Sequence, residues 1–159
     1  MFRHIAVAFL LCSGVAVADQ TVSALTAADE QRLSEQRAVV TRYLDEQNLR
    51  KYEAAAGKLG TLRALLAAKI FRSDQTYELQ SMGIVFGDVF VQDMGFHWVI
   101  VEDEHGRDPA IRYAETSVIL FPLTMISKRV EAGETVDVFD LYNGVAARAR
   151  ELVDDEVSR

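Results

Sequence analysis

The densest group of chemically capable side chains in this sequence is the run Asp103-Glu104-His105-Gly106-Arg107-Asp108. General acid–base catalysis uses such a combination, because histidine titrates near neutral pH and a neighbouring carboxylate can orient its ring. The same composition is typical of an ordinary solvated turn, since Gly106, Asp108 and the following Pro109 are residues that turns favour. Both interpretations stay open, and the turn is preferred.

Other kinds of catalytic or metal site lack the residues they need. His97 and His105 are the histidines after the first eighteen residues, and no Glu-x-x-His or His-x-x-x-His pair occurs. Zinc usually takes three or four nitrogen, sulfur or oxygen ligands from the protein. We therefore expect no metal and no cofactor, assign no catalytic residue, and expect His97 to be a partly buried strand residue.

The N-terminus, Met1–Ala18, has the three parts of a cleavable secretory signal peptide. Arg3 and His4 give a weakly positive start, residues 5–17 are apolar and uncharged, and small residues at 16 and 18 precede polar sequence. The segment is shorter than the roughly 20 apolar residues that a membrane-spanning helix needs. We expect cleavage after Ala18, with residues 19–159 forming one domain that contains no membrane span.

Charge and cysteine content narrow the function classes further. The chain has 17 basic and 24 acidic residues, a net charge of −7, and a single cysteine at position 12 within the expected signal peptide. Cleavage would leave no thiol for catalysis or disulfides. The basic residues are scattered, which argues against nucleic acid as a partner, because nucleic-acid binding needs a clustered positive potential.

The pattern of apolar residues predicts an α+β fold in which helices pack on a sheet. Residues 19–94 are expected to be mainly helical, residues 95–121 to form strands, and residues 122–159 to be helical. Thr26-Ala-Ala-Asp29 resembles a capping box that starts a first helix, which we expect to end near Asn48. The next segment, Tyr52–Ile70, contains Gly57 and Gly60 and is left open as one helix or two short ones, with Thr61 capping the second.

The second half of the chain predicts the remaining elements. A third helix should start at Ser73-Asp74, and Gly83 and Gly87 on it are expected to allow close packing of another element, because glycine inside a helix otherwise costs stability. Three strands of an antiparallel meander should follow, then a short helix and a C-terminal helix capped by Asp137. We expect the strands at Phe96–Asp103, Ala110–Tyr113 and Ser117–Phe121, and the short helix at Leu123–Glu131.

Several segments resemble, in order, the bacterial family called domain of unknown function 3806. They are Leu79–Gly87, Trp98–Asp103, Gly106–Ala110, Arg112-Tyr113 and Phe121–Arg129. The resemblance implies a bacterial source and therefore the periplasm as destination, and it brings no known catalytic residues. It also suggests that Arg107, Asp108 and Arg112 form a polar network beside Trp98, serving as a structural clamp or as the floor of a site.

The leading hypothesis is a non-enzymatic periplasmic domain that binds an envelope protein or a small ligand. Its expected binding residues are Trp98, Asp103, Glu104, His105, Arg107, Asp108 and Arg112. The alternative is a hydrolase acting on a cell-envelope component, with Glu104, His105 and Asp108 as acid and base. A purely structural role cannot be separated from the first hypothesis by sequence.

Overall fold

A computed structural model describes residues 20–104 and 106–158, which form six helices and a four-stranded antiparallel sheet. The expected signal peptide, residues 1–18, lies outside the described residues. The helices are α1 (Ala27–Thr41), α2 (Glu46–Tyr52), α3 (Ala55–Ala67), α4 (Thr76–Met94), α5 (Leu123–Glu131) and α6 (Val138–Val157). The strands are β1 (Thr21–Ser23), β2 (Phe96–Asp103), β3 (Gly106–Tyr113) and β4 (Ile119–Leu120). The predicted α+β class is confirmed.

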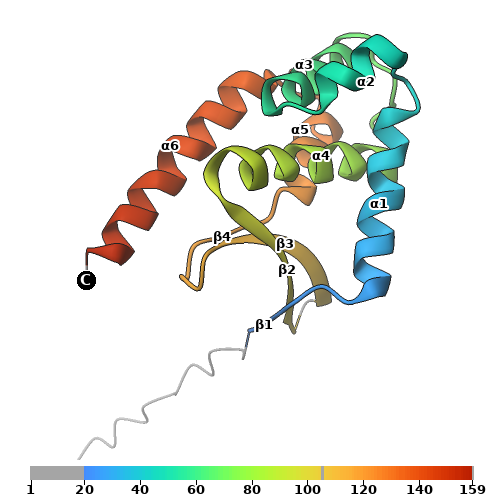
Figure 1. Ribbon diagram of the computed structural model, residues 1–159. Helices are drawn as coiled ribbons and strands as arrows, with labels where there is room; N and C mark the ends of the chain where they lie inside the picture. The colour runs from blue at the N-terminus through green and yellow to red at the C-terminus, as the bar shows by residue number, and fades with distance from the viewer. Residues whose placement is uncertain (1–19, 105, 159) are drawn as a thin grey trace, which may run out of the picture.

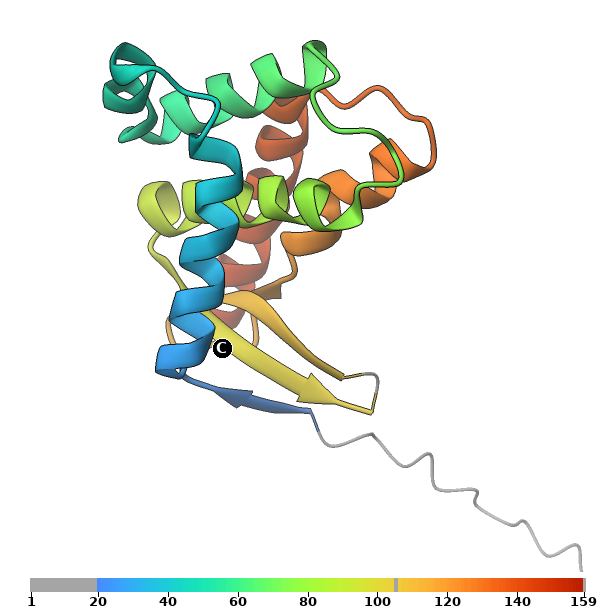
Figure 2. The same ribbon diagram turned by 90° about the vertical axis from the view of Figure 1, so that its right-hand side faces the viewer.

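The elements stack in three layers, with α2 and α3 on one side, α4 and α5 in the middle, and the sheet on the other side (Figures 1 and 2). Helices α1 and α6 run across the layers at opposite ends of the stack (Figure 1). Tyr43, just after α1, packs edge-on against Phe71, which follows α3. Asp29, near the start of α1, binds Arg107 in the sheet. At the other end, Glu156 in α6 accepts hydrogen bonds from the backbone N–H and hydroxyl of Ser117 beside the sheet. The two helices therefore tie the layers together.

The sheet has the order β1-β2-β3-β4, so the expected three-stranded meander is present and β1 extends it at one edge. Trp98 lies opposite Ile111, and Val99 lies opposite Ala110. Because side chains alternate along a strand, Trp98 and Ile111 face the helices and join the main core. A second buried cluster on the opposite face contains Val99, Val101 and Ala110, with Val22 and Ile119 against it. Both faces of β2 thus carry buried side chains.

The ends of several helices follow the capping residues identified in the sequence. The capping box of α1 is formed, since Asp29 accepts from the Thr26 backbone N–H at 2.9 Å and donates its own N–H to the Thr26 hydroxyl. Asp137 caps α6, and α5 has the predicted bounds. These starts depend on contacts within four residues, and such local contacts can be read from sequence.

The first helical segment was predicted wrongly, and the second, left open as one helix or two, contains one helix over Ala55–Ala67. A single helix ending near Asn48 is not formed, because α1 ends at Thr41 and Asp45 caps a new helix by accepting the Asn48 N–H at 2.8 Å. Conversely, α3 continues through Gly57 and Gly60, and Thr61 is buried within it and does not cap a helix. A Cβ on Gly57 would lie 1.7 Å from the carbonyl oxygen of Lys51. That glycine therefore permits the tight approach of α2 to α3 and does not interrupt the helix.

The two glycines of α4 allow close packing, as predicted. A Cβ on Gly83 would lie 2.4 Å from the carbonyl oxygen of Leu123 in α5, and one on Gly87 would lie 2.6 Å from the Trp98 ring and 2.7 Å from Pro122. No ordinary side chain tolerates such distances. The glycines let the start of α5 and the ring of Trp98 lie directly against α4.

Candidate functional site

The hairpin residues predicted to form a binding surface do not converge. The register of β2 and β3 places Trp98 and Arg107 on the helix-covered face, and Asp103, Asp108 and Arg112 on the opposite face. Glu104 is exposed in the turn, and His105 lies outside the described residues. The expected network of Arg107, Asp108 and Arg112 beside Trp98 is therefore wrong, because neighbouring residues of a strand point to opposite sides of the sheet.

Arg107 instead clamps the hairpin to helix α1. Its two terminal nitrogens donate to the two oxygens of Asp29 at 2.6 and 2.7 Å, and the Asp29 side chain is only 3% exposed. Hydrogen bonds from Arg107, and then from Thr26, hold the pKa of Asp29 well below its usual range. Arg112 closes the next turn by donating to the carbonyl oxygens of Thr116 and Glu115 at 2.6 and 2.7 Å. Both arginines have structural contacts, but neither pairs with Asp108, and the acid that Arg107 binds is Asp29, which the sequence did not suggest.

Trp98 belongs to a second polar cluster, beneath helix α4. Its indole N–H donates to Asp88 at 2.9 Å, and Asp88 also receives two hydrogen bonds from Arg37 of α1 at 2.7 Å each. The Asp88 side chain is 12% exposed and that of Arg37 is 33% exposed. The hydrogen bonds to Asp88 raise the pKa of Arg37. One carboxylate thus joins α1, α4 and β2.

Tyr52 lies close to this cluster without joining it by a hydrogen bond. Its hydroxyl is buried and has no hydrogen-bond partner among the described residues. Burial, together with the negative charge of Asp88, raises the pKa of Tyr52. Lys58 lies over the Tyr52 ring and donates to Gln92 at 2.8 Å, and burial lowers the pKa of this lysine. The hydroxyl of Tyr52 is an unsatisfied polar group within an otherwise paired cluster.

The described residues offer no further support for acid–base or metal chemistry at the hairpin. Glu104 and Asp108 are exposed on the hairpin, and His97, expected to be partly buried, is exposed as well. No group of three or more His, Cys, Asp or Glu side chains is placed to hold a metal ion within residues 20–104 and 106–158. In the same part of the chain, no helix has both the length and the apolar character required to cross a membrane.

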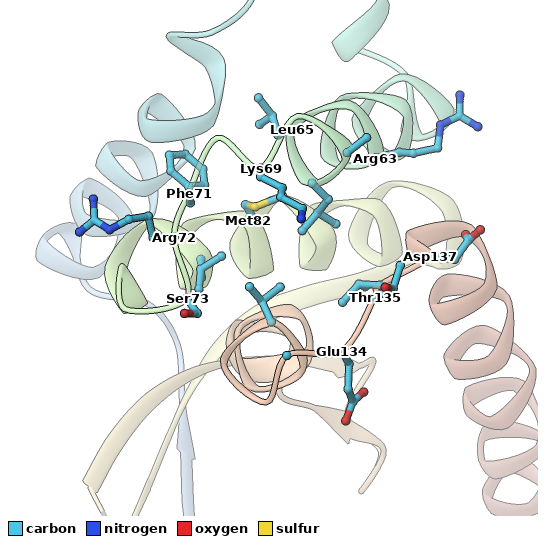
Figure 3. A pocket seen from close by; sticks show the side chains of 16 residues that line it. Arg63, Leu65, Lys69, Phe71, Arg72, Ser73, Met82, Glu134, Thr135 and Asp137 are labelled. Carbon is cyan, nitrogen blue, oxygen red and sulfur yellow. The ribbon is translucent and has the colours of Figure 1, made fainter.

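A pocket of about 610 Å³ opens instead between the ends of α3 and α5 and the start of α4, and we call it the α3–α5 pocket (Figure 3). None of the seven predicted hairpin residues lines it. Its walls are largely apolar, and they include Leu65, Leu66, Phe71, Leu79, Met82 and Val130. Its volume is within the range of about 300–1,000 Å³ that small-molecule sites occupy. Charged residues stand around its rim: Arg63, Lys69, Arg72, Glu134 and Asp137.

Two helix ends of the same geometry form opposite sides of this pocket. At the end of α5, Gly133 has a φ of 77°, its N–H donates to Val130, and the Glu134 N–H donates to Arg129. This arrangement is the Schellman motif, in which a left-handed residue ends the helix. The second motif ends α3 and is built in the same way, except that the left-handed residue is Lys69, with a φ of 49°. There the Lys69 N–H donates to Leu66 and the Ile70 N–H donates to Leu65.

A groove of about 570 Å³ lies on the other side of Leu65, between α2 and α3, and we call it the α2–α3 groove. Its floor is made of small residues of α3, including Gly57, Gly60 and Ala64. Tyr43 and Ile70 at its rim are 47% and 38% exposed. Fewer large apolar side chains line it than line the α3–α5 pocket.

The family model described as "Domain of unknown function (DUF3806)" matches residues 58–142, more than half of the chain. The chain belongs to this family. The resemblance noted in the sequence is thereby confirmed, and the matched segment contains every residue that lines the α3–α5 pocket. The sequence has no match among curated proteins.

A crystal structure of a protein from Bacteroides thetaiotaomicron VPI-5482 is similar in fold, with a TM-score of 0.63 and 13% sequence identity. The similarity covers 80% of this member of the DUF3806 family and 47% of that protein, so the present chain spans about half of its length. At this identity the likeness concerns the fold alone.

The sequence did not identify Asp88 or Lys69 as residues of a polar cluster or a pocket. Asp88 lies within the α4 pattern between Gly87 and Val89, and only the fold reveals that it meets Arg37 and Trp98. Lys69 could have been noticed, because α3 ends without the glycine that usually follows a helix. The four residues after Ala67 are Ala-Lys-Ile-Phe, so any left-handed residue that ends this helix is not a glycine.

Proposed function

We propose that this protein is exported to the periplasm as residues 19–159 and acts there as a non-enzymatic binding domain whose ligand occupies the α3–α5 pocket. The observation that carries this proposal is the pocket itself. It combines a volume suited to a small molecule, apolar walls and a charged rim within the family-matched segment.

A binding role fits the contacts of the polar clusters better than a catalytic one. Asp29 and Asp88 are each held by an arginine in a two-point contact, which fixes these carboxylates and occupies their oxygens. A general base has to lie within hydrogen-bond reach of the proton that it removes from the substrate. Neither carboxylate lines the α3–α5 pocket. The carboxylates are therefore better suited to hold the fold than to transfer protons.

Support for export comes from the sequence. Arg3, an uncharged apolar stretch and small residues at 16 and 18 are the features that a signal peptidase substrate combines. Expressing the full-length chain in a bacterium and separating the cell fractions tests this part. We expect the protein in the periplasm with Asp19 as its first residue by mass spectrometry. A cytoplasmic protein that retains Met1–Ala18 would overturn it.

The binding part is tested by blocking the pocket without disturbing the core. Ala67 and Ala64 are both exposed residues of α3, and the first lines the α3–α5 pocket whereas the second lines the α2–α3 groove. Native mass spectrometry of protein purified from its own periplasm, together with titration of an apolar fluorescent probe, measures occupancy. We expect A67W to lose bound ligand and probe, and the matched variant A64W to keep both. Loss in A64W alone would move the site to the α2–α3 groove and overturn the proposal.

A further inference from the structure

Lys69 has a backbone conformation that is unfavourable for a residue with a side chain. Its φ of 49° lies in the left-handed region, where glycine is usual at the end of a helix. The matching position at the end of α5 is indeed a glycine, Gly133, with a φ of 77°. Backbone strain of this kind tends to persist where a side chain serves a function. The question is therefore what the lysine side chain does that glycine could not.

The ammonium group of Lys69 extends over the α3–α5 pocket, whereas the other charged rim groups turn away from it (Figure 3). Arg72 points outward and pairs with Asp74 at 3.0 Å, and the Arg63 guanidinium lies over the ring of Phe139 at 5.0 Å. The carboxylate of Glu134 points away from the pocket. Among the charged residues labelled in Figure 3, Lys69 is thus the one that presents a positive charge toward the apolar walls.

Lys69 forms no ion pair and no side-chain hydrogen bond with residues 20–104 or 106–158. The carboxylate of Asp137 also lines the pocket, where one of its oxygens caps α6 by accepting the Phe139 N–H at 2.9 Å, and it forms no ion pair with Lys69. An unpaired ammonium beside a largely apolar surface is complementary to a ligand with an apolar body and one negative group.

We propose that Lys69 is the residue that binds the head group of the ligand, and that the ligand is an aliphatic carboxylate. This inference rests on the proposed function of the α3–α5 pocket. The apolar walls, including Leu65, Phe71 and Met82, bind the hydrocarbon chain, and the ammonium group binds the carboxylate. A neutral apolar ligand would gain nothing from the ammonium group, whereas a carboxylate would gain a charge-assisted hydrogen bond.

Titration of the mature protein with matched amphiphiles tests the ligand class. The probes are hexanoate, octanoate and decanoate, with decanol and decyltrimethylammonium as ten-carbon controls. We expect decanoate to bind more tightly than either control. Each added methylene should tighten binding about fourfold until the pocket is filled, because burial of a methylene is worth a fixed increment of free energy. Equal binding of decanoate and decyltrimethylammonium would overturn the assignment of a carboxylate.

The variant K69G separates a binding role of Lys69 from a structural one, because a binding role predicts that stability rises while the affinity for decanoate falls. Relief of the left-handed strain should raise Tm by about 2–4 °C, while loss of the ammonium should weaken decanoate binding about fivefold and leave decanol unchanged. Ala114 provides the matched control, since it is also left-handed, with a φ of 44°, and does not line the pocket. We expect A114G to show a similar rise in Tm and unchanged binding of decanoate.

The outcomes distinguish this inference from the proposed function. If decanoate and decanol bind but K69G affects neither, the pocket is a site and the role of Lys69 is refuted. If A67W changes the binding of no probe, the pocket itself is refuted and this inference falls with it. If a short apolar peptide with a free C-terminal carboxylate displaces the fluorescent probe and decanoate does not, the ligand class is wrong.

Discussion

Replacing Gly83 by alanine tests how closely α4 and α5 approach each other. The added Cβ would lie 2.4 Å from the carbonyl oxygen of Leu123 and 2.6 Å from that of Pro122. Both neighbours are backbone atoms, so a side-chain rotation cannot relieve the overlap. Reaching the 3.4 Å of an ordinary contact requires α5 to move by about 1 Å, and overpacking of this kind costs roughly 3 kcal/mol.

The helix itself gains from the same change, which sets the net magnitude. Alanine is favoured over glycine in a helix interior by about 1 kcal/mol, so G83A should destabilise the protein by about 2 kcal/mol. Gly144 in α6 is the matched control, because a Cβ there meets nothing within 4 Å. The variant G144A should therefore stabilise the protein by about 1 kcal/mol.

Urea unfolding followed by circular dichroism measures both variants against the wild type. The expected difference of about 3 kcal/mol between G83A and G144A corresponds to roughly 6–12 °C in Tm for a chain of this size. If G83A were as stabilising as G144A, α5 could not lie against α4 as described. The reasoning about the two glycines of α4 would then be refuted.

Three further changes test the polar clusters. Y52F should raise the free energy of unfolding by about 1 kcal/mol in urea unfolding, because it removes a buried hydroxyl that has no partner in the described part of the chain; a loss of stability would mean that the hydroxyl is paired. D88N should cost about 2 kcal/mol of stability in the same assay, since it leaves Arg37 without its counter-charge, and it should shift the fluorescence of Trp98. The control is E46Q, which removes the exposed ion pair of Glu46 with Arg50 and should cost about 0.3 kcal/mol. Burial raises the pKa of Tyr142 from 10.0 to about 12, so the contribution of its neutral hydroxyl to stability is complete below pH 10 and is lost as the pH rises through 12. Y142F should therefore reduce the pH dependence of Tm between pH 10 and 12. An unchanged pH dependence would contradict the raised pKa of Tyr142.

The fold was predictable from sequence wherever short-range contacts decide it. The capping box at Thr26, the cap at Asp137 and the helix that follows Pro122 all depend on residues within one helical turn. Strand β1 was missed because three residues carry no detectable periodicity, and its hydrogen bonds are to β2, some eighty residues further along the chain. The sequence left open whether a helix continues through Gly57, because the close approach of Lys51 that this glycine permits is a contact between two helices.

The candidate site was far less predictable, for the same physical reason. The polar run around His105 drew attention because its residues are adjacent in sequence, but adjacent strand residues point to opposite faces. The α3–α5 pocket is assembled from helix ends and loops spread over residues 63–137, and most of its lining is apolar. Apolar residues at helical spacing predict a core, and sequence alone does not reveal which part of that core is left open. Lys69 carried a usable signal, the absence of glycine after α3, but only if the end of the helix had been placed correctly.

The limits of the family match do not coincide with the limits of the structure that supports the pocket. The match begins at residue 58, after α1 and α2. Yet Phe71, which lines the pocket, packs edge-on against Tyr43, with ring centres 5.6 Å apart. Asp88 of α4 depends on Arg37 of α1 for two of its hydrogen bonds. Removing residues 19–57 would leave a nearly buried carboxylate without its counter-charge and expose a wall of the pocket. The binding proposed for the α3–α5 pocket should therefore be measured on the longer chain, because the matched segment alone lacks these contacts.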